Sequence, residues 1–203
     1  MRFDKQMPNP KKTPTTVYDA ILSRRSIRRF KQKPIKTELL KKLVNAARLA
    51  PSAANLQPLE FFVVNNEKSC SRIFETIAWA GYLKDWTPSK KEKPTAYIVI
   101  LVKNINNSWY IRDVSLASEN IVLTAESEGI GSCILLNINK DKLREILKIP
   151  KDIEIDSIIA LGYKAEHPLT EEMKDSVKYW KDEKQVLHVP KRKLEDILHI
   201  NKF

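Results

Sequence analysis

The stretch AYIVILV, residues 96–102, holds seven consecutive residues without a charged or amide side chain. A half-exposed strand would alternate apolar and polar residues, whereas this run is continuous. It is typical of a strand that is covered on both faces. The stretch therefore predicts the centre of a layered protein with helices packed on a sheet.

Other apolar segments predict the strands that flank this centre. Each one is short, rich in β-branched or aromatic residues and bounded by turn-forming residues. We expect these strands at residues 59–65, 132–136 and 155–163.

Between the strands, apolar residues recur at helical spacing. Thr16 and Asp19 form a capping-box-like start for the first helix, and Gly129 stands where the longest helix should end. Thr37 and Asn139 are expected to cap two others. We expect helices at residues 17–24, 37–50, 68–79, 112–128 and 140–149.

The pattern is a mixture of α and β elements, with about four central strands and five helices. No segment is rich enough in Gly, Ser or Pro to divide the chain. We expect an extended N-terminal arm over residues 1–14 and one domain over 15–203. Within that domain, residues 164–203 form an extended C-terminal segment.

The bulk composition excludes several classes of protein. With 203 residues and 42% apolar side chains, the chain can bury a core, which argues against disorder. No apolar run approaches the ~20 residues that span a bilayer, and we expect neither a secretory signal nor a membrane partner. Cys70 and Cys133 lie in apolar surroundings, far apart, and are expected to be free and buried. Without a Cys/His cluster we expect no structural metal, and we expect a cytoplasmic location.

The positive charge is concentrated near the start of the sequence. The net charge is +11, and residues 1–48 alone contain 14 Lys/Arg against three Asp/Glu. Residues 49–203 contain 22 of each sign. Such a block favours an anionic partner, either a phosphate-bearing ligand, a lipid surface or nucleic acid, but a solvated basic face would have the same composition.

The densest part of this block is SRRSIRRF, residues 23–30. Arg24 and Arg28 are four positions apart, with the Ser26 hydroxyl between them. Guanidinium groups bind phosphate oxygens through paired, charge-assisted hydrogen bonds. The segment fits a phosphate clamp, although a basic surface helix or a kinase substrate site has a similar pattern.

Two further stretches add polar groups. PSAANLQP, residues 51–58, offers Ser52, Asn55 and Gln57, whose neutral donors and acceptors suit a flat heterocycle with carbonyls and ring nitrogens. PKRKL, residues 190–194, supplies further cations near the end of the chain. Taken singly, these stretches are equally consistent with a polar turn and a solvated tail.

Together, in this order, the motifs resemble those of the nitroreductase family of flavin enzymes. RRSIRRF matches the family's opening R-[RH]-S-x-[RK]-x-[FY] motif, and PSAANLQP matches its P-S-x-x-N-x-Q-P loop. AESEGIGSCILL, IIALGYKAEHP and PKRKLEDILH are similar to its later segments. The resemblance covers roughly residues 16–200, and its strength lies in the order of five individually weak motifs.

The resemblance implies an α+β three-layer sandwich, with a central mixed or antiparallel sheet flanked by helices, that works as an intertwined homodimer. It implies FMN at the dimer interface and NADH or NADPH as electron donor. The resemblance also implies a set of residues that bind FMN through polar side chains or through the backbone. Arg24, Arg25 and Ser26 are assigned to the phosphate, Arg28 to the N1–C2 edge of the ring, Ser52, Asn55 and Gln57 to the ribityl chain or ring from the partner, Leu136 and Asn137 to the N5 side, and Lys191, Arg192 and Lys193 to closing the phosphate site.

The activity implied is transfer of a hydride from NAD(P)H to a small electron-poor acceptor, a nitroaromatic, quinone or activated alkene, by a ping-pong cycle. Flavin supplies the hydride chemistry, so no catalytic side chain is assigned. Dehalogenation, flavin breakdown or dehydrogenation of a modified peptide remain alternatives within the family. A basic nucleic-acid-binding protein is the alternative outside it, but the sequence has no aromatic or zinc-finger signature for that function, and we expect no nucleic-acid partner.

The sequence also departs from the family pattern. Leu59 stands where Trp is frequent, and Leu136 stands where some members have an acidic residue. Residues 80–94 match no family motif. In relatives this region covers the substrate side, so Trp79, Tyr82 and Trp86 are candidates for stacking on a ligand, with packing at a subunit interface as the alternative.

Overall fold

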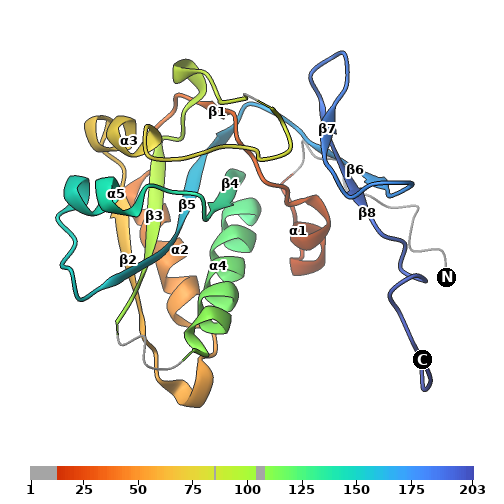
Figure 1. Cartoon of the computed structure of the whole chain (residues 1–203), viewed down its shortest axis with the longest axis horizontal. Helices are drawn as coiled ribbons and strands as arrows, with labels where there is room; N and C mark the ends of the chain where they lie inside the picture. The colour runs from red at the N-terminus through yellow and green to blue at the C-terminus, as the bar shows by residue number, and fades with distance from the viewer. Residues whose placement is uncertain (1–12, 85, 104–107) are drawn as a thin grey trace.

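The computed structural model describes residues 13–84, 86–103 and 108–203 (Figure 1). The first twelve residues of the expected N-terminal arm lie outside the described residues. The chain forms an α+β sandwich in which helices cover both faces of an antiparallel sheet, as predicted.

The central sheet is built around two long strands. β3 (Ala96–Val102) is buried at every position, and β5 (Glu154–Lys164) pairs with it antiparallel from Leu161 to Glu154. β2 (Leu59–Val64) pairs with the other edge of β3, while β4 (Ile130–Leu135) and the short β1 (Phe30–Lys31) pair with β5. The continuous apolar run therefore does form the centre of the sheet.

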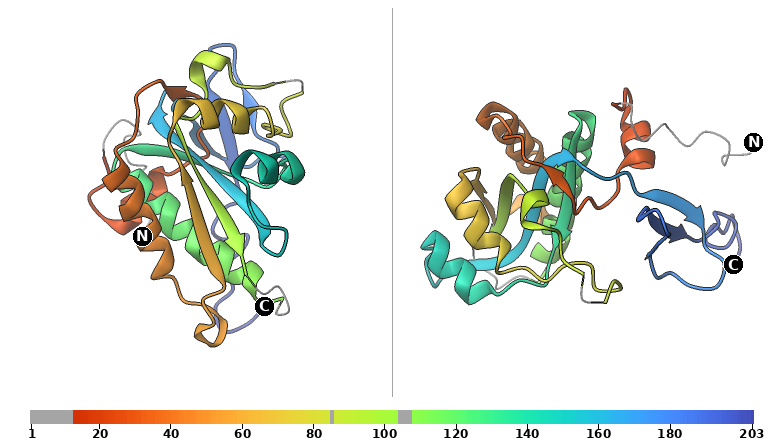
Figure 2. Two further views of the ribbon diagram at one scale, coloured as in Figure 1. Left: turned by 90° about the vertical axis from the view of Figure 1, so that its left-hand side faces the viewer. Right: turned by 90° about the horizontal axis from the view of Figure 1, so that it is seen from above.

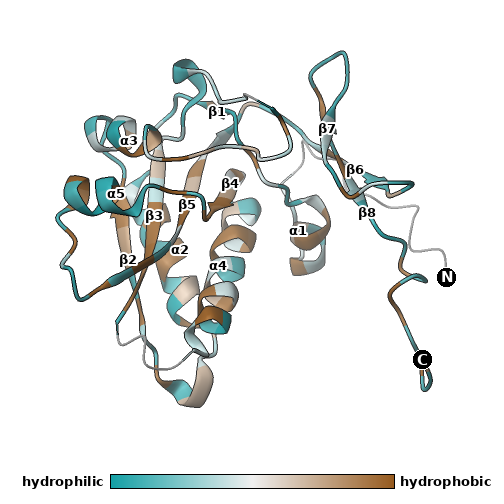
Figure 3. Cartoon of the chain, viewed as in Figure 1, coloured by the Kyte–Doolittle hydropathy of each residue, from teal (hydrophilic) through white to brown (hydrophobic). Residues whose placement is uncertain are grey.

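Two separate apolar clusters cover the two faces of this sheet. On one face, α2 (Thr37–Arg48) and α4 (Tyr110–Ser127) pack against alternate residues of β3, including Ile98 and Ile100. On the other face, α3 (Glu67–Phe74) and α5 (Lys140–Leu147) pack against Tyr97 and Val99. Figure 2 shows the helices on the two sides of the strands, and Figure 3 shows hydrophobic residues along the central strands. Burial on both faces explains why the sequence of β3 does not alternate.

Most helix boundaries agree with the sequence predictions. α1 (Val17–Ser23) begins with the Thr16–Asp19 capping box, Gly129 has a left-handed φ of 71° after α4, and Asn139 caps α5. Thr37, however, is not a cap. Lys36 occupies the cap position of α2 without a side-chain hydrogen bond, and the Thr37 hydroxyl accepts a hydrogen bond from Asn65 instead.

The helix expected over residues 68–79 is shorter than predicted. α3 ends at Phe74 because the following residues pair with the segment after β4. The Ala78 amide donates to the Asn137 carbonyl at 3.0 Å, and the Asn139 amide donates to the Thr76 carbonyl at 2.8 Å. These tertiary hydrogen bonds replace the last helical turn.

The C-terminal segment contains a second small sheet that the sequence analysis missed. β6 (Leu169–Glu172) pairs parallel with β8 (Leu187–Lys191), and β7 (Trp180–Lys181) pairs antiparallel with β8. Figures 1 and 2 show this sheet beside the main body, on the side of α1. Among the described residues, no helix has both the length and the apolar character needed to cross a bilayer.

Candidate active site

The end of α1 places the arginine-rich segment against the central sheet. Arg24, at the helix C-cap, has an extended backbone (φ −59°, ψ 128°), so the chain leaves the helix there. Ile27 and Phe30 are buried, and the Ile27 amide donates to the Ser132 carbonyl of β4 at 2.8 Å. In an extended backbone neighbouring side chains point in opposite directions, so these apolar anchors determine where the charged side chains point.

Three residues of this segment have unusual polar surroundings. Arg24 and Arg28 have Nε groups without a hydrogen-bond partner in the described part of the chain, and the Ser26 hydroxyl lies beside a thiol. Nε of Arg24 lies 3.7 Å from a Glu119 carboxylate oxygen, beyond hydrogen-bond distance. Nε of Arg24 and Nε of Arg28 are both buried, and within the described residues neither donates a hydrogen bond. Buried N–H groups without acceptors are costly, which makes them candidates for binding an anion.

The Ser26 hydroxyl lies next to the Cys133 thiol on β4. Cys133 is 2% exposed, and burial raises the pKa of its thiol, although Arg28 nearby acts in the opposite direction. Cys133 is therefore a neutral, inaccessible group beneath the cationic segment, and it is unsuited to act as a nucleophile.

Arg28 is held from two sides. Its backbone amide donates to a Glu166 carboxylate oxygen at 2.5 Å, and the Arg29 amide donates to the same oxygen at 3.1 Å. The Arg28 guanidinium carbon lies 5.0 Å from the centre of the Tyr179 ring. The Arg29 guanidinium instead binds Glu92, at 2.6 Å from Nη2. The guanidinium groups of these two adjacent arginines therefore contact different parts of the protein.

Arg25 binds the protein itself. Its Nε donates to the Thr170 hydroxyl at 2.5 Å, Nη2 donates to the Leu22 carbonyl at 2.5 Å, and Nη1 donates to the Arg24 carbonyl. Burial lowers the pKa of this guanidinium, with a smaller contribution in the same direction from Arg24. These contacts join the end of α1 to β6.

A buried carboxylate anchors the same helix end. Glu126 on α4 is 2% exposed; it accepts a hydrogen bond from the Ser23 hydroxyl at 2.9 Å and pairs with Nζ of Lys164 at 2.7 Å. Sequence reasoning missed Glu126 and Glu166. The position of Glu126 on the buried side of α4, where an apolar residue is expected, and the AEHP motif around Glu166 were the available signals.

The second predicted group, Ser52, Asn55 and Gln57, lies on the loop between α2 and β2. Asn55 and Gln57 have left-handed backbone conformations, with φ of 55° and 49°. The Gln57 amide donates to the Ser52 hydroxyl at 3.1 Å, and the Ala53 amide donates to the buried Asp113 carboxylate at 3.0 Å. Left-handed residues other than glycine are strained and persist where the surroundings hold them. Asp113 was not predicted from the sequence.

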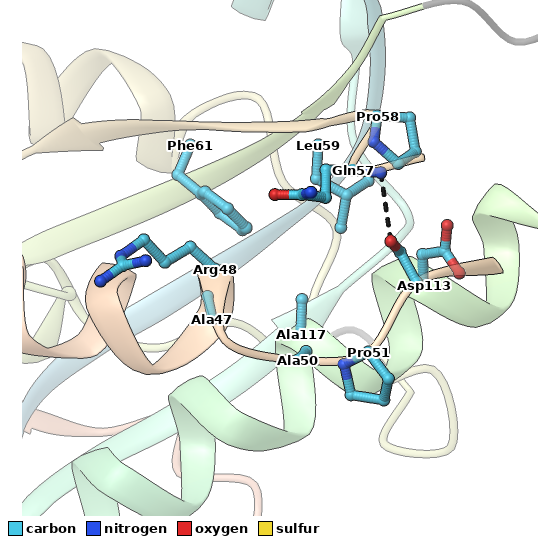
Figure 4. A pocket seen from close by; sticks show the side chains of 11 residues that line it. Ala47, Arg48, Ala50, Pro51, Gln57, Pro58, Leu59, Phe61, Asp113 and Ala117 are labelled. Atoms are coloured by element: carbon cyan, nitrogen blue, oxygen red, sulfur yellow. Dashed lines mark hydrogen bonds between the residues drawn. The ribbon is translucent and has the colours of Figure 1, made fainter. Parts of the chain in front are cut away.

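This loop forms one wall of a cavity of about 150 Å³. Figure 4 shows Arg48 and Phe61 at one side of the cavity and Asp113 at the other, with Gln57 above it. The cavity is therefore lined by polar side chains, among them Gln57 and Asp113, and by apolar side chains of α2, β2 and α4.

A single chain does not bring the two groups together. The end of α1 contacts α4 at Glu126, whereas the 51–58 loop contacts α4 at Asp113. These positions are 13 residues apart, or about 20 Å along a helix at ~1.5 Å per residue. Figure 1 likewise shows the α2–β2 loop at the opposite end of the main body from the start of β1.

Leu136 and Asn137 follow β4 directly. The Leu136 side chain is 70% exposed, and the Asn137 carbonyl accepts a hydrogen bond from the Ala78 amide at 3.0 Å. Leu136 is four residues beyond Ser132, the β4 residue that bridges Ser26, a separation of about 13 Å along a strand at ~3.3 Å per residue. These residues share one edge of the sheet with the Arg24–Arg28 segment.

The C-terminal cations lie in the small sheet and after it. The Lys191 carbonyl accepts from the Met173 amide at 2.7 Å, Arg192 donates to the Asp196 carbonyl at 2.7 Å, and Nζ of Lys193 lies 3.0 Å from Glu172. The hydrogen bond to Glu172 raises the pKa of Lys193. The described contacts of these residues are within the C-terminal segment, and none of them reaches Arg24 or Arg28.

The three aromatic residues near the 80–94 loop have different surroundings. Trp79 is buried against Phe74, with ring centres 5.7 Å apart, and belongs to the core. Tyr82 is half exposed and packs on Tyr179, and Trp86 lies beneath Nζ of Lys181 at 4.2 Å. Trp79 is therefore excluded as a ligand contact, and Tyr82 and Trp86 stay candidates.

Comparison with known proteins identifies the family of this chain. The Nitroreductase family profile matches residues 21–163. A Methanothermobacter thermautotrophicus protein named as an NADH dehydrogenase/NAD(P)H nitroreductase is 33% identical over 165 residues, covering 78% of this chain and 83% of that protein. An iodotyrosine deiodinase of Thermotoga neapolitana is 28% identical over 165 residues, covering 72% and 88%. The structure of a nitroreductase with bound FMN from Bacteroides fragilis superposes with a TM-score of 0.62 at 25% identity, covering 80% and 96%. The chain belongs to the nitroreductase family.

Proposed function

We propose that this protein is an FMN-dependent oxidoreductase that takes a hydride from NADH or NADPH and passes it to a small electron-poor acceptor. The observation that carries the proposal is the pair of buried Nε–H groups of Arg24 and Arg28, which lack acceptors among the described residues. They lie on either side of the Ser26 hydroxyl in the sequence. The Arg24 guanidinium and the Ser26 hydroxyl fit the phosphate end of a mononucleotide, and the Arg28 guanidinium fits the edge of its ring where negative charge develops.

We assign the individual residues to different parts of the cofactor. Arg24 and Ser26 would bind the phosphate, and Arg25 would fix the end of α1 through its three hydrogen bonds to the protein. Leu136 and Asn137 would meet the ring from the end of β4. Lys191, Arg192 and Lys193 could close the phosphate site only from another copy of the chain or after moving, since they contact their own segment.

When bound, FMN supplies the hydride chemistry, and the chain positions it and tunes its charge. The Arg28 guanidinium would stand near the N1–C2 edge of the ring, where negative charge develops on reduction, and would stabilise that charge. The side chains of Tyr82 and Trp86 would border the space that donor and acceptor occupy in turn in a ping-pong cycle. We assign no side-chain nucleophile.

The site would be completed by a second copy of the chain. The 51–58 loop with Ser52, Asn55 and Gln57 is too far from Arg24 to share a mononucleotide with it in one chain. Apolar side chains that a dimer would cover are exposed on α1 and in the C-terminal segment. They are Val17, Tyr18 and Ile21 on α1, and Leu194, Ile197, Leu198 and Ile200 near the C-terminus. Sedimentation of the purified protein as a monomer at micromolar concentration would contradict this assembly.

Binding of FMN to purified apo-protein tests the proposal. Wild-type protein should bind FMN, quench its fluorescence, and lose its yellow colour when NADPH or NADH is added. We expect Arg24→Ala to raise the dissociation constant about 10- to 100-fold, since a hydrogen bond to a charged group contributes ~1.5–3 kcal/mol. Ser26→Ala should raise it less. Arg72→Ala, on the exposed side of α3, is the matched control and should bind like wild type.

Two results would refute different parts of the proposal. If the wild-type protein is colourless after incubation with excess FMN and removal of the unbound FMN, both the proposed cofactor and the proposed activity are refuted. A wild-type protein that binds FMN, with Arg24→Ala and Ser26→Ala variants that bind it equally well, removes these residues from the phosphate site.

A second activity, reductive dehalogenation of an aromatic substrate, is favoured by the similarity to an iodotyrosine deiodinase. The aromatic rings of Tyr82 and Tyr179 beside Arg28 suit a flat aromatic acceptor in either reaction. Parallel assays with a nitroaromatic and with iodotyrosine, using the same reductant, distinguish the two. Turnover of iodotyrosine with negligible nitroaromatic reduction would replace the first activity by the second.

A further inference from the structure

Tyr179 joins two parts of the molecule that are far apart in the sequence. It precedes β7, and its ring packs against the core cluster beneath the 80–94 loop. One side of the ring faces the Arg28 guanidinium, 5.0 Å from the ring centre. The Tyr179 hydroxyl accepts a hydrogen bond from the Tyr82 amide at 3.3 Å, and the two tyrosine rings are 5.0 Å apart.

The strand that follows Tyr179 presents alternate residues to the same loop. Lys181 lies two positions on, and its Nζ is 4.2 Å from the centre of the Trp86 ring. Trp180, between them, points the other way and stacks on His188 with ring centres 4.4 Å apart. This alternation is the period of an extended strand. One face of the β7 segment therefore contacts the loop and Arg28, and on the other face Trp180 stacks on His188 of the neighbouring strand β8.

The direction of the Arg28 guanidinium depends on few contacts. Glu166 fixes the backbone amide of Arg28, but the described contacts of the guanidinium include no hydrogen bond from Nε. A long arginine side chain loses much rotamer freedom when it is fixed. The Tyr179 ring is the contact that orients it, because a guanidinium is attracted to the face of an aromatic ring.

We propose that Tyr179 is a positioning residue that holds the Arg28 guanidinium toward the cofactor ring and links it to the loop carrying Tyr82. The proposal rests on the FMN site proposed above. The ring would set the strength with which Arg28 stabilises the reduced cofactor. The hydroxyl would hold the loop. These two contributions can be separated by substitution.

Three variants separate them. Tyr179→Leu removes the ring and the hydroxyl but keeps an apolar side chain. Tyr179→Phe keeps the ring and removes the acceptor. Trp180→Leu changes the neighbouring residue on the opposite face and is the matched control for general disruption of β7. Thermal unfolding of each apo-protein establishes that the variant is folded before the other measurements are made.

The first measurements are the dissociation constant for oxidised FMN and the midpoint potential of bound FMN. We expect Tyr179→Leu to raise the dissociation constant about two- to fivefold, the size of an exposed to partly buried cation–π contact. It should also lower the midpoint potential, because the reduced form loses more stabilisation than the oxidised form. Tyr179→Phe and Trp180→Leu should match wild type in both quantities.

The second measurement needs no cofactor. Hydrogen exchange of the apo-protein should be faster in peptides containing Tyr82 for both Tyr179 variants, because the Tyr82 amide has lost its acceptor. Trp180→Leu should leave this exchange unchanged. Equal exchange in wild type and Tyr179→Phe would overturn the link to the loop.

The outcomes also separate this inference from the proposed function. If wild type binds no FMN, the proposed function fails while the exchange measurement still tests the Tyr179 contact. If wild type binds FMN and Tyr179→Leu has the same affinity and potential, the positioning role is overturned and the proposed function stands. Equal losses in Tyr179→Leu and Trp180→Leu, or in Tyr179→Leu and Tyr179→Phe, would also overturn a role for the aromatic ring.

Discussion

The ion pair between Glu126 and Lys164 gives the strongest prediction about stability. Their side chains are only 3% and 15% exposed, and Glu126 also accepts the Ser23 hydroxyl hydrogen bond. Glu126→Ala would leave the Lys164 ammonium partly buried without its partner. Removing one partner of a buried pair costs roughly 3–5 kcal/mol. Because Lys164 keeps some access to water, we expect the low end, about 3 kcal/mol.

The chain provides a matched control two residues further on, at the C-cap of α4. Glu128 pairs with Lys42 at 2.5 Å, but this pair is exposed, with side-chain exposures of 33% and 59%. Exposed pairs contribute ~0–1 kcal/mol. Glu128→Ala should therefore change the free energy of unfolding by less than about 1 kcal/mol.

The assay is thermal and urea unfolding of the apo-protein at one fixed concentration, because assembly makes stability depend on concentration. A loss of about 3 kcal/mol should lower the Tm by roughly 6–12 °C in a chain of this size. The double variant Glu126→Leu with Lys164→Met should recover much of this loss, because it replaces both charges with apolar groups. Equal effects of Glu126→Ala and Glu128→Ala, or no recovery in the double variant, would refute the reasoning.

Two further predictions concern the core. Burial raises the pKa of the Cys70 thiol to about 11, so above pH 9.0 the unfolded chain releases this proton before the folded chain does. The free energy of unfolding should then fall as pH rises from 9 to 11, and urea titrations of Cys70→Ala should show a smaller fall; identical slopes would contradict the shift. A Cβ added at Gly162 would lie 2.7 Å from the buried Phe30 ring, so Gly162→Ala should cost about 1–3 kcal/mol by overpacking. Gly81→Ala, where a Cβ meets nothing within 4 Å, should be close to neutral in the same unfolding assay.

The central strands and most helices could be predicted because their signals are local. An uninterrupted apolar run such as residues 96–102 has few alternatives to a buried strand, and the capping pair Thr16–Asp19 marks a helix start. The end of α3 could not be predicted in this way. Its last expected turn is replaced by hydrogen bonds to residues 137–139, which lie about 60 positions away in the sequence.

The small C-terminal sheet was missed for a related reason. Its strands contain between two and five residues, and β6 and β8 are parallel, with a long connection between them. Strands this short hold too few apolar residues to show a hydrophobic period that distinguishes them from an extended tail. Pairing between distant residues, rather than local preference, makes this structure.

For the candidate site, the motifs named candidate residues but could not give the directions of their side chains. Four arginines within six positions are chemically identical in sequence, yet Arg25 binds protein carbonyls and Thr170, Arg29 binds Glu92, and Arg24 and Arg28 keep buried Nε atoms without hydrogen bonds among the described residues. Which of the four arginines binds the protein and which stays available to a ligand depends on the extended backbone after Arg24 and on acidic residues from distant segments. No local rule contains that information.

The same contacts bear on which anionic partner the basic block near the start of the sequence favours. A run of positive charge attracts nucleic acid only if the charges share an exposed face. Here Arg24 lies near Glu119, Arg29 binds Glu92 and Lys42 binds Glu128, so several cations of the block face carboxylates from the other three-quarters of the chain. Among the described residues of the block, Arg24 and Arg28 in addition hold buried Nε–H groups without acceptors. Such an arrangement favours a compact phosphate over an extended polyanion, and it predicts that FMN binding will depend far more on Arg24 and Arg28 than on the number of lysines around them.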